Sequence, residues 1–351
     1  MKKKFVAVLL ALCMVLALCA CGSSSAPAES AAPAESAAPA APAESAAPAE
    51  SAAPADGGPS ESLTFVTGGE TGTYYAFGSV IAQYVSANTN LSITAVSGNG
   101  SKANVEDMDA GSYELGFCQS DVMSYAHDGT NIFAESGAVD SFSAVAALYM
   151  EQVQIVTMNP DIKTVADLKG KKVSIGASGS GVNFNAIDVL KAYDMTVDDI
   201  DPQYLDFGDS AEGLKDGKID AAFVVAGAPT VAISDLSTSG QVYLVGFDKE
   251  HTDKLIADCP YYSTYTIKKD VYGTPADVDT VAVAAVVLAR NDVSEDAVYN
   301  FMTAVFDNLD ELTKAHAKGG ELSLEFASSI TDVPYHPGAV KYFAEHDITV
   351  K

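Results

Sequence analysis

The sequence that follows residue 62 alternates short β-rich runs with runs whose apolar residues have helical spacing. A loop with three glycines separates the first expected strand from the first expected helix. Strands that alternate with helices in this way predict an α/β fold with a mixed, mainly parallel sheet. The first unit places strands and helices in turn over residues 63–67, 74–86, 91–96, 102–110 and 114–118.

A second unit of the same kind lies further along the chain, again with glycines in the loop before its first helix. Gly111 and Gly217 each begin a stretch in which a phenylalanine follows six residues later. Either these are two unrelated βα units, or they are two related α/β lobes that face each other. The second unit places strands over residues 172–175, 204–207 and 219–225, with helices over 182–192 and 210–215.

Two such lobes predict a ligand cleft between them. In open α/β sheets ligands bind at the carboxyl ends of the strands, where both glycine loops lie, each at the start of a helix. The backbone N–H groups and the helix dipole there favour an anionic group. A cleft of this kind closes by a hinge if the chain crosses between the lobes more than once. We expect residues 63–150 plus 262–351 to form the first lobe and residues 151–261 to form the second.

The first 20 residues have the features of a secretory signal. Three lysines follow Met1, an apolar run extends to Ala17, and small residues precede a cysteine. The stretch Leu18-Cys19-Ala20-Cys21 resembles a bacterial lipobox, which would place a lipid on Cys21. An ordinary signal peptide and a short membrane helix are the alternatives, but spanning needs about 20 apolar residues. We therefore expect a protein anchored by lipid to the outer face of the cytoplasmic membrane.

Residues 21–62 are predicted to form a tether. After the cysteine they consist almost entirely of Ala, Pro, Glu, Ser and Gly, and a short unit rich in Ala and Pro recurs. With almost no large apolar side chain, nothing offsets the entropy lost on ordering, so this segment is expected to be disordered. The globular part then begins at Leu63.

The charge of the chain limits its partners. There are 47 acidic and 20 basic residues, for a formal net charge of −27. Such a surface argues against nucleic acid and against adhesion to anionic headgroups. Arg290 is the only arginine, so a bidentate guanidinium contact to an anion has one candidate. An anion would otherwise be held by lysines, hydroxyls, amides or helix N-termini.

Cysteine and histidine give no sign of a metal site. Outside the signal region only Cys118 and Cys259 remain, and both a disulfide and two free thiols are compatible with the sequence. The five histidines show no ligand spacing with these cysteines. We expect neither a metal nor a cofactor.

Eight short motifs, each weak alone, occur in an order that resembles the TAXI family of TRAP-transporter solute-binding proteins. The resemblance covers residues 63 to about 347. The motifs are Thr67-Gly-Gly-Glu-Thr-Gly-Thr-Tyr-Tyr75, Gly100-Ser-Lys-Ala-Asn104, Gly116-Phe-Cys-Gln-Ser-Asp121, Asp167-Leu-Lys-Gly-Lys-Lys172, Gly176-Ala-Ser-Gly-Ser-Gly181, Asp216-Gly-Lys-Ile-Asp220, Ala226-Gly-Ala-Pro229 and Tyr335-His-Pro-Gly-Ala-Val-Lys-Tyr342.

The resemblance implies a two-lobed type II periplasmic-binding-protein fold. It implies that the protein delivers a small carboxylate, such as glutamate, glutamine or a 2-oxo dicarboxylate, to a TRAP permease driven by an ion gradient. It also suggests which loops line the cleft. The implied ligand-binding residues are Gly72, Thr73, Tyr74, Ser101, Asn104, Gln119, Ser120, Asp121, Ser178, Gly179, Ser180, Gly227 and Pro229.

Residue types assign roles to some of these. Ser101, Ser178 and Ser180 would hold a carboxylate, and Gln119 and Asn104 would offer amide hydrogen bonds. For Asp121, pairing with a ligand ammonium and capping of a helix are both open.

Other functions fit less well. The run Gly176-Ala-Ser-Gly-Ser180 lacks the last glycine of the nucleophile elbow of hydrolases. The loop at Gly69 lacks the lysine of a P-loop. A cell-surface hydrolase is therefore disfavoured, and no enzymatic activity is expected. The closest alternative is the substrate-binding lipoprotein of an ATP-driven (ABC) importer.

Overall fold

The computed structural model describes residues 61–351. The predicted signal peptide, the lipid on Cys21 and nearly all of the predicted tether lie outside the described residues. The tether prediction ends at residue 62, whereas the first strand begins at Glu61, which pairs with Leu91 in the neighbouring strand. Within the described part, no helix is both long enough and apolar enough to cross a membrane.

Ten strands form one sheet in the described part of the chain. Their order across the sheet is β2-β1-β3-β10-β4-β7-β5-β6, while β8 pairs with β4 and β9 with β10. The strands are β1 (Glu61–Val66), β2 (Leu91–Val96), β3 (Leu115–Gln119), β4 (Phe142–Thr157), β5 (Lys172–Ser174), β6 (Asp201–Gln203), β7 (Ala221–Ala226), β8 (Tyr243–Val245), β9 (Ser263–Ile267) and β10 (Val278–Arg290).

The expected α/β class with a mixed sheet is confirmed, but the sheet is less parallel than expected. The βα units pair in parallel, β1 with β2 and β3, and β5 with β6 and β7. Every pairing of β4 or β10 with another strand is antiparallel. These two long strands join the parallel units at the centre of the sheet, and they account for the difference.

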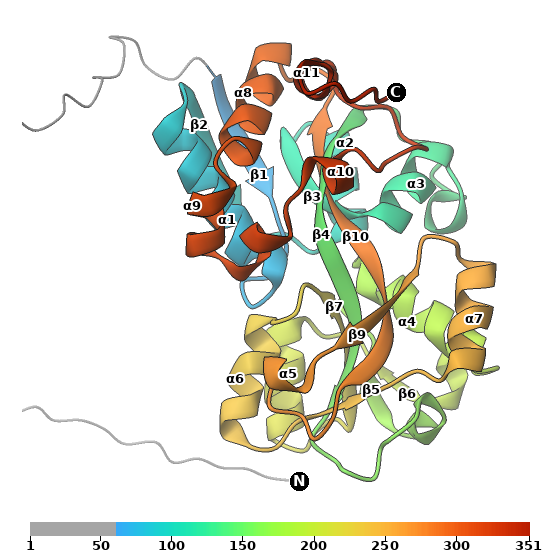
Figure 1. Cartoon of the computed structure of the whole chain (residues 1–351). Helices are drawn as coiled ribbons and strands as arrows, with labels where there is room; N and C mark the ends of the chain where they lie inside the picture. Colours follow the sequence, from blue (N-terminus) through green and yellow to red (C-terminus); the bar gives the residue numbers. More distant parts are fainter. Residues whose placement is uncertain (1–60) are drawn as a thin grey trace, which may run out of the picture. The chain divides into compact units, whose positions relative to one another are not determined.

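β4 and β10 run side by side through the whole molecule (Figure 1). The first half of β4 pairs with the end of β10, and its second half pairs with β7 and β8. β10 pairs with β9 at its start and with β3 at its end. Its apolar run from Val281 to Ala289 is almost entirely buried, as a strand covered on both faces requires.

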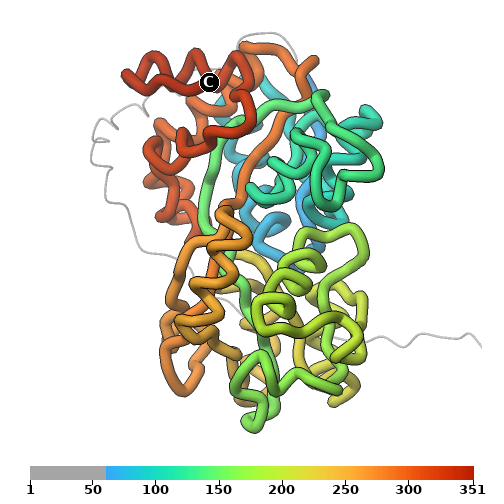
Figure 2. Tube along the Cα trace, turned by 90° about the vertical axis from the view of Figure 1, so that its right-hand side faces the viewer, coloured from blue at the N-terminus to red at the C-terminus, as the bar shows by residue number. Residues whose placement is uncertain are grey.

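Helices lie on both sides of each half of this sheet (Figures 1 and 2). Several of them begin directly after a strand. The helices are α1 (Thr73–Asn88), α2 (Ser101–Asp109), α3 (Ser120–Asp128), α4 (Gly181–Ala192), α5 (Phe207–Lys215), α6 (Val231–Ser239), α7 (Lys249–Asp258), α8 (Glu295–Phe306), α9 (Leu309–Ala315), α10 (Leu324–Ala327) and α11 (Pro337–Glu345).

The buried apolar side chains show where the two lobes lie. One cluster draws on residues 63–149 and 285–343. Two further clusters draw only on residues 153–283. We call residues 61–150 plus 284–351 the first lobe and residues 151–283 the second lobe.

This packing supports a later boundary than the expected one at residues 261/262. Tyr262, Val281 and Val283 pack in the second lobe, and Ala285 is the first residue of β10 in the first-lobe cluster. The second crossing therefore lies in the middle of β10. β9 joins the second lobe because it pairs with the start of β10.

One predicted strand is wrong in place. Residues 204–207 were expected as a strand, but β6 ends at Gln203 and α5 begins at Phe207. Asp206 caps α5 by accepting a hydrogen bond from the N–H of Asp209, so this stretch starts a helix. Cys118 and Cys259 are free thiols in this structure, which resolves the two alternatives left by the sequence.

Candidate functional site

A cleft of about 530 Å³ lies between the lobes. The first lobe contributes residues 68–74, residues 97–101 and Gln119 to its lining. The second lobe contributes Ala177, residues 180–182, residues 206–209, Glu212, Val225 and Ala226, together with Glu151 on β4. The predicted cleft between two lobes is therefore present, and it lies at the carboxyl ends of β1, β3 and β7.

Four helices begin at this cleft. The residues at the starts of α1, α2, α4 and α5 all belong to its lining. The N–H groups of the first turn of a helix have no partner within the helix. They also carry the positive end of the helix dipole. Part of the cleft wall is thus suited to a negatively charged group.

Hydrogen bonds join the lobes around the cleft, so this is a closed arrangement. Ala103 N donates to Gly179 O at 3.2 Å. Gln119 Nε2 donates to Asn185 Oδ1 at 2.8 Å, and Asn185 Nδ2 donates to Asp121 Oδ2 at 2.9 Å. All three contacts connect the first lobe with α4 or with the loop before it.

Gly181 at the start of α4 is essential to this closed contact. A Cβ atom at Gly181 would lie 1.4 Å from Gln119 Oε1. The backbone of α4 therefore approaches the Gln119 side chain more closely than any other residue type allows. This close approach is the main reason for a glycine here, since its backbone conformation is ordinary.

Six of the predicted site residues line the cleft: Gly72, Thr73, Tyr74, Ser101, Gln119 and Ser180. Ser180 also caps α4, because its Oγ accepts from Asn183 N at 3.3 Å. Ser101 Oγ accepts from Gln119 N at 3.1 Å. These side chains hold the loops in shape as well as facing the cleft.

Four other predicted residues lie behind the cleft wall and do not line it. Asn104 Nδ2 donates to Thr67 O and Phe117 O, so it joins the ends of β1 and β3. Ser120 Oγ accepts from Ala284 N of β10. Asp121 is buried against Asn185, and burial raises the pKa of its carboxyl to about 6. The fourth is Gly179, whose carbonyl accepts from Ala103 N.

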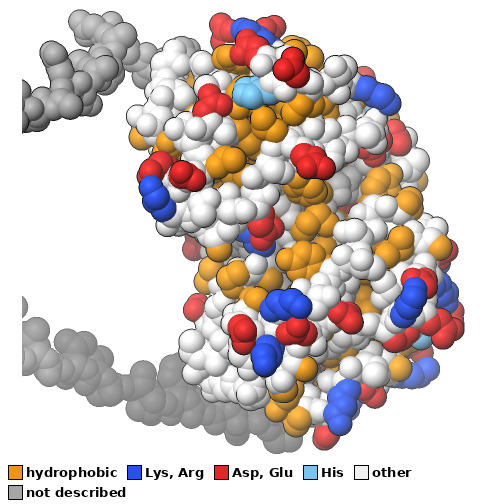
Figure 3. All heavy atoms as spheres, viewed as in Figure 1, with side chains coloured by type: hydrophobic (Ala, Val, Ile, Leu, Met, Phe, Trp, Pro, Cys, Tyr) orange, Lys and Arg blue, Asp and Glu red, His pale blue; other side chains and the backbone are white. Residues whose placement is uncertain are grey.

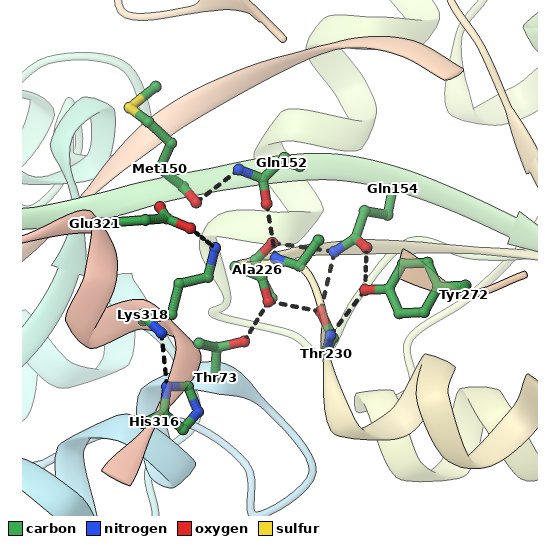
Figure 4. Close-up of polar contacts among 12 residues, drawn as sticks. Thr73, Met150, Gln152, Gln154, Ala226, Thr230, Tyr272, His316, Lys318 and Glu321 are labelled. Carbon is green, nitrogen blue, oxygen red and sulfur yellow. Dashed lines mark hydrogen bonds and ion pairs between the residues drawn. The ribbon is translucent and has the colours of Figure 1, made fainter. Parts of the chain in front are cut away.

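The last three predicted residues, Ser178, Gly227 and Pro229, also lie outside the cleft lining. Ser178 is exposed at the tip of its loop. Gly227 O accepts from Thr73 Oγ1 at 2.7 Å and from Thr230 Oγ1 at 3.1 Å, which links the lobes behind the cleft (Figure 4). Pro229 follows a cis peptide bond in the same loop. Seven of the thirteen predicted residues therefore do not line the cleft.

The same region holds a network of amide side chains from β4 and hydroxyl groups from outside the sheet (Figure 4). Gln152 Oε1 accepts from Ala228 N at 2.7 Å. Tyr272 Oη donates to Gln154 Oε1 at 2.6 Å, and Gln154 Nε2 donates to Thr230 Oγ1 at 3.0 Å. These bonds fix the loop after β7 against β4, so they support the cleft from behind.

Glu151 is a cleft residue that the sequence reasoning missed. It lies on β4 at the level where the strand passes between the lobes, with only 2% of its surface exposed. Its Oε2 accepts from Tyr74 Oη at 2.6 Å. Burial is the main cause that raises the pKa of Glu151 to about 8, and the nearby Asp121 adds to it. The available signal was that Glu151 is the only charged residue in this long, mostly apolar stretch.

A second missed group comes from the start of α5. Asp206, Asp209 and Glu212 line the cleft and are exposed, and Phe207 lies beside the loop of the first lobe. The misplaced strand over residues 204–207 concealed this helix start. Among the described residues, no group of three or more His, Cys, Asp or Glu side chains is arranged to hold a metal ion.

The fold and the site together define a class: a two-lobed α/β protein with a closed cleft between its lobes. The chain belongs to the NMT1-like family, whose model matches residues 65–346. The family match does not distinguish the TAXI subdivision, which stays a prediction.

Solved structures with some similarity include periplasmic binding proteins. The aliphatic sulphonate binding protein SsuA from Escherichia coli shares 19% identity over 75% of this chain and 80% of its own, with a TM-score of 0.42. The alkanesulfonate-binding SsuA from Xanthomonas axonopodis pv. citri, bound to MOPS, shares 15% over 83% and 92%, with a TM-score of 0.46. A putative L-cystine ABC transporter protein from Listeria monocytogenes shares 14% over 76% and 98%, with a TM-score of 0.45. These likenesses are too distant to indicate a ligand for this chain.

Proposed function

We propose that this protein is an extracytoplasmic solute receptor that captures a small carboxylate by closure of its two lobes and passes it to a membrane permease. The observation that carries this proposal is the cleft itself, which is lined by both lobes and by the N-termini of four helices. A carboxylate at such a point accepts hydrogen bonds from backbone N–H groups and interacts favourably with the helix dipoles.

Closure is supported by the way the lobes are connected. The chain crosses between them in β4 and β10, and hydrogen bonds such as Gln119 to Asn185 join the facing walls. The lobes can separate if β4 and β10 flex where they cross between them, as in hinge-bending receptors. The proposed role requires no bond to be made or broken in the ligand.

For the permease, we favour a TRAP transporter because of the ordered motifs, with an ABC importer as the alternative. Uptake in cells separates the two. A TRAP system loses uptake when the ion gradient is dissipated and keeps it when ATP alone is depleted, and an ABC system shows the reverse. We further place the protein on the outer face of the cytoplasmic membrane, held by a lipid on Cys21, which labelling with a fatty acid would test.

Ligand binding itself is tested by thermal shift. The purified protein is unfolded and refolded to remove bound solute, and its melting temperature is then measured against amino acids, 2-oxo acids and dicarboxylates. A ligand present at 100 times its dissociation constant adds about 2.7 kcal/mol of stability, which is a shift of several degrees. If no small acid shifts the melting temperature, the proposal of a carboxylate receptor is wrong.

A further inference from the structure

One carboxyl group in the cleft is buried and only partly used by the protein. Glu151 accepts a single hydrogen bond, from Tyr74 Oη to its Oε2. No described residue donates to its Oε1, although Glu151 belongs to the cleft lining. The Tyr74 ring is held in place by stacking on Phe117, with ring centroids 4.6 Å apart. The protein thus presents a fixed carboxyl group with one oxygen free for a ligand.

No described cation is paired with the Glu151 carboxyl group. Tyr74 of α1 and Tyr149 of β4 face it, and Asp121 of α3 is a second acid nearby. Among the described groups, Lys318 is the only cation that lowers the pKa of Glu151. It lies in the 3-10 helix Ala317–Glu321. The Lys318 ammonium is paired with Glu321 at 2.6 Å and does not line the cleft.

The other charged side chains of the cleft carry the same sign of charge as Glu151. Glu70, Asp206, Asp209 and Glu212 are exposed at its rim, and none of the described lining residues is Lys, Arg or His. Cations elsewhere are largely engaged with neighbouring acids, and basic side chains on the drawn face mostly lie beside acidic ones (Figure 3). A ligand with two negative charges would enter a cleft with five carboxyl groups.

Another part of the cleft lining is different in character. The starts of α1, α2 and α4 contribute N–H groups and the hydroxyls of Ser101 and Ser180. The cleft lining therefore contains groups that suit a carboxylate as well as a carboxyl group that suits a cation. A buried ionised carboxyl group is costly when alone and much less so when paired.

We propose that the ligand carries a protonated amino group that pairs with the Glu151 carboxylate, so that amino acids bind and 2-oxo acids do not. This inference rests on the proposed receptor function and narrows its ligand class. Pairing with an ammonium accounts for the free oxygen of Glu151, for the acidic rim and for the absence of basic side chains in the described lining.

The test compares matched compounds that differ only in the amino group. Each amino acid is titrated by calorimetry beside its 2-oxo acid and its des-amino acid, for example glutamine beside glutaramic acid. Loss of a buried charge pair predicts that the analogues bind about 30-fold more weakly or worse. Simple alkyl amines and polyamines, which lack a carboxylate, form a third series.

Two variants assign the effect to the residue. Glu151→Gln keeps an acceptor for Tyr74 and is expected to lose the preference for the amino acid over its des-amino analogue. Glu135→Gln, at an exposed acid in a loop away from the cleft, is the matched control and keeps the preference. Unfolding curves of both variants show whether the fold is intact, and the preference ratio within one variant is independent of the amount of folded protein.

Proton exchange gives a second readout. Because burial holds the pKa of Glu151 near 8, this group is mostly protonated in the unliganded protein at pH 7. An ammonium ligand would ionise it, so binding releases a proton and the affinity rises between pH 6 and pH 8. Calorimetry in two buffers of different ionisation enthalpy measures this release, which Glu151→Gln should abolish. Proton uptake would contradict the proposal, since it means that a neutral Glu151 donates to a bound anion.

The outcomes separate the inference from the receptor function. A preference for amino acids supports both. A 2-oxo or des-amino acid that binds as tightly as its amino acid overturns the inference and leaves the receptor function in place. Amines that bind without a carboxylate support the inference and overturn the carboxylate part of the function. If no compound of the three series binds, the receptor function fails and the inference fails with it.

Discussion

The two glycine loops look alike in sequence, but they line the cleft to different extents in the structure. In the loop of the first lobe, every residue from 68 to 72 lines the cleft. In the loop of the second lobe, Ala177, Ser180 and Gly181 line it, Ser178 is exposed, and Gly179 accepts a hydrogen bond from the facing lobe. Both loops are walls that also join the lobes, since Thr71 O of the first loop accepts from Ala232 N of α6 at 3.1 Å. The second loop differs in that only part of it lines the cleft.

The glycines themselves are needed for different reasons. Gly176 and Gly179 have φ values of 83° and 82°, a left-handed conformation that other residues rarely adopt. None of the glycines of the first loop has a positive φ. There, a Cβ at Gly72 would lie 3.2 Å from Gly69 O, so space is the constraint. A shared glycine pattern therefore does not imply a shared role.

The strongest way to break the second loop is Gly181→Ala. Its Cβ would overlap Gln119, which would have to leave its place and lose the hydrogen bond to Asn185. Overpacking plus a lost hydrogen bond costs about 2–4 kcal/mol in the closed state. We expect the ligand to bind roughly 30- to 1000-fold more weakly, measured by calorimetry with the ligand found in the thermal-shift experiment.

The control for this change is Gly320→Ala, where the new Cβ would be 3.6 Å from the nearest atom in an ordinary contact outside the cleft. It should bind as the natural protein does. Unliganded Gly181→Ala should melt close to the temperature of the natural protein, because the open molecule avoids the clash. The loss should appear in the ligand affinity instead. Unchanged affinity in Gly181→Ala would show that the closed arrangement is not the one that binds.

The next largest effect concerns the contact between the lobes. Gln119→Ala removes the donor to Asn185, and Asn185→Ala leaves both Gln119 and Asp121 without this partner. Each change should weaken binding by about 1–3 kcal/mol, because buried polar groups lose their hydrogen bonds. The loss of binding free energy in the double variant should be smaller than the sum of the two single losses by about 0.5 kcal/mol or more. Strict additivity would mean that the two side chains act independently of each other.

Much of the fold could be predicted because apolar spacing and glycine positions mark the βα units. β2 was placed at its observed bounds, and β1, β3 and α1 within two residues. β4 gave no clear signal, because Glu151, Gln152 and Gln154 interrupt its apolar run while lying buried in the structure. Most of their hydrogen-bond partners come from distant parts of the chain, which no local pattern can show.

The lining of the cleft was predictable as a set of loops more than as a set of side chains. Gly72, Tyr74 and Gln119 were named from motifs and do line the cleft. Asn104 was named for its amide, which is used to join two strands. Which side of a loop faces the cleft depends on how the opposite lobe approaches, so residues such as Glu151 became visible only in three dimensions.

The smallest expected effects compare two serines of one loop. Ser180 caps α4 and lines the cleft, whereas Ser178 is exposed two residues earlier. Ser180→Ala removes the cap, which is worth about 1 kcal/mol, so binding should weaken roughly fivefold. Ser178→Ala should change neither affinity nor melting temperature, because its hydroxyl contacts no described residue that matters to closure. Equal losses in both variants would mean that the loop tip also reaches the ligand, and the distinction between the wall and the exposed part of this loop would have to be redrawn.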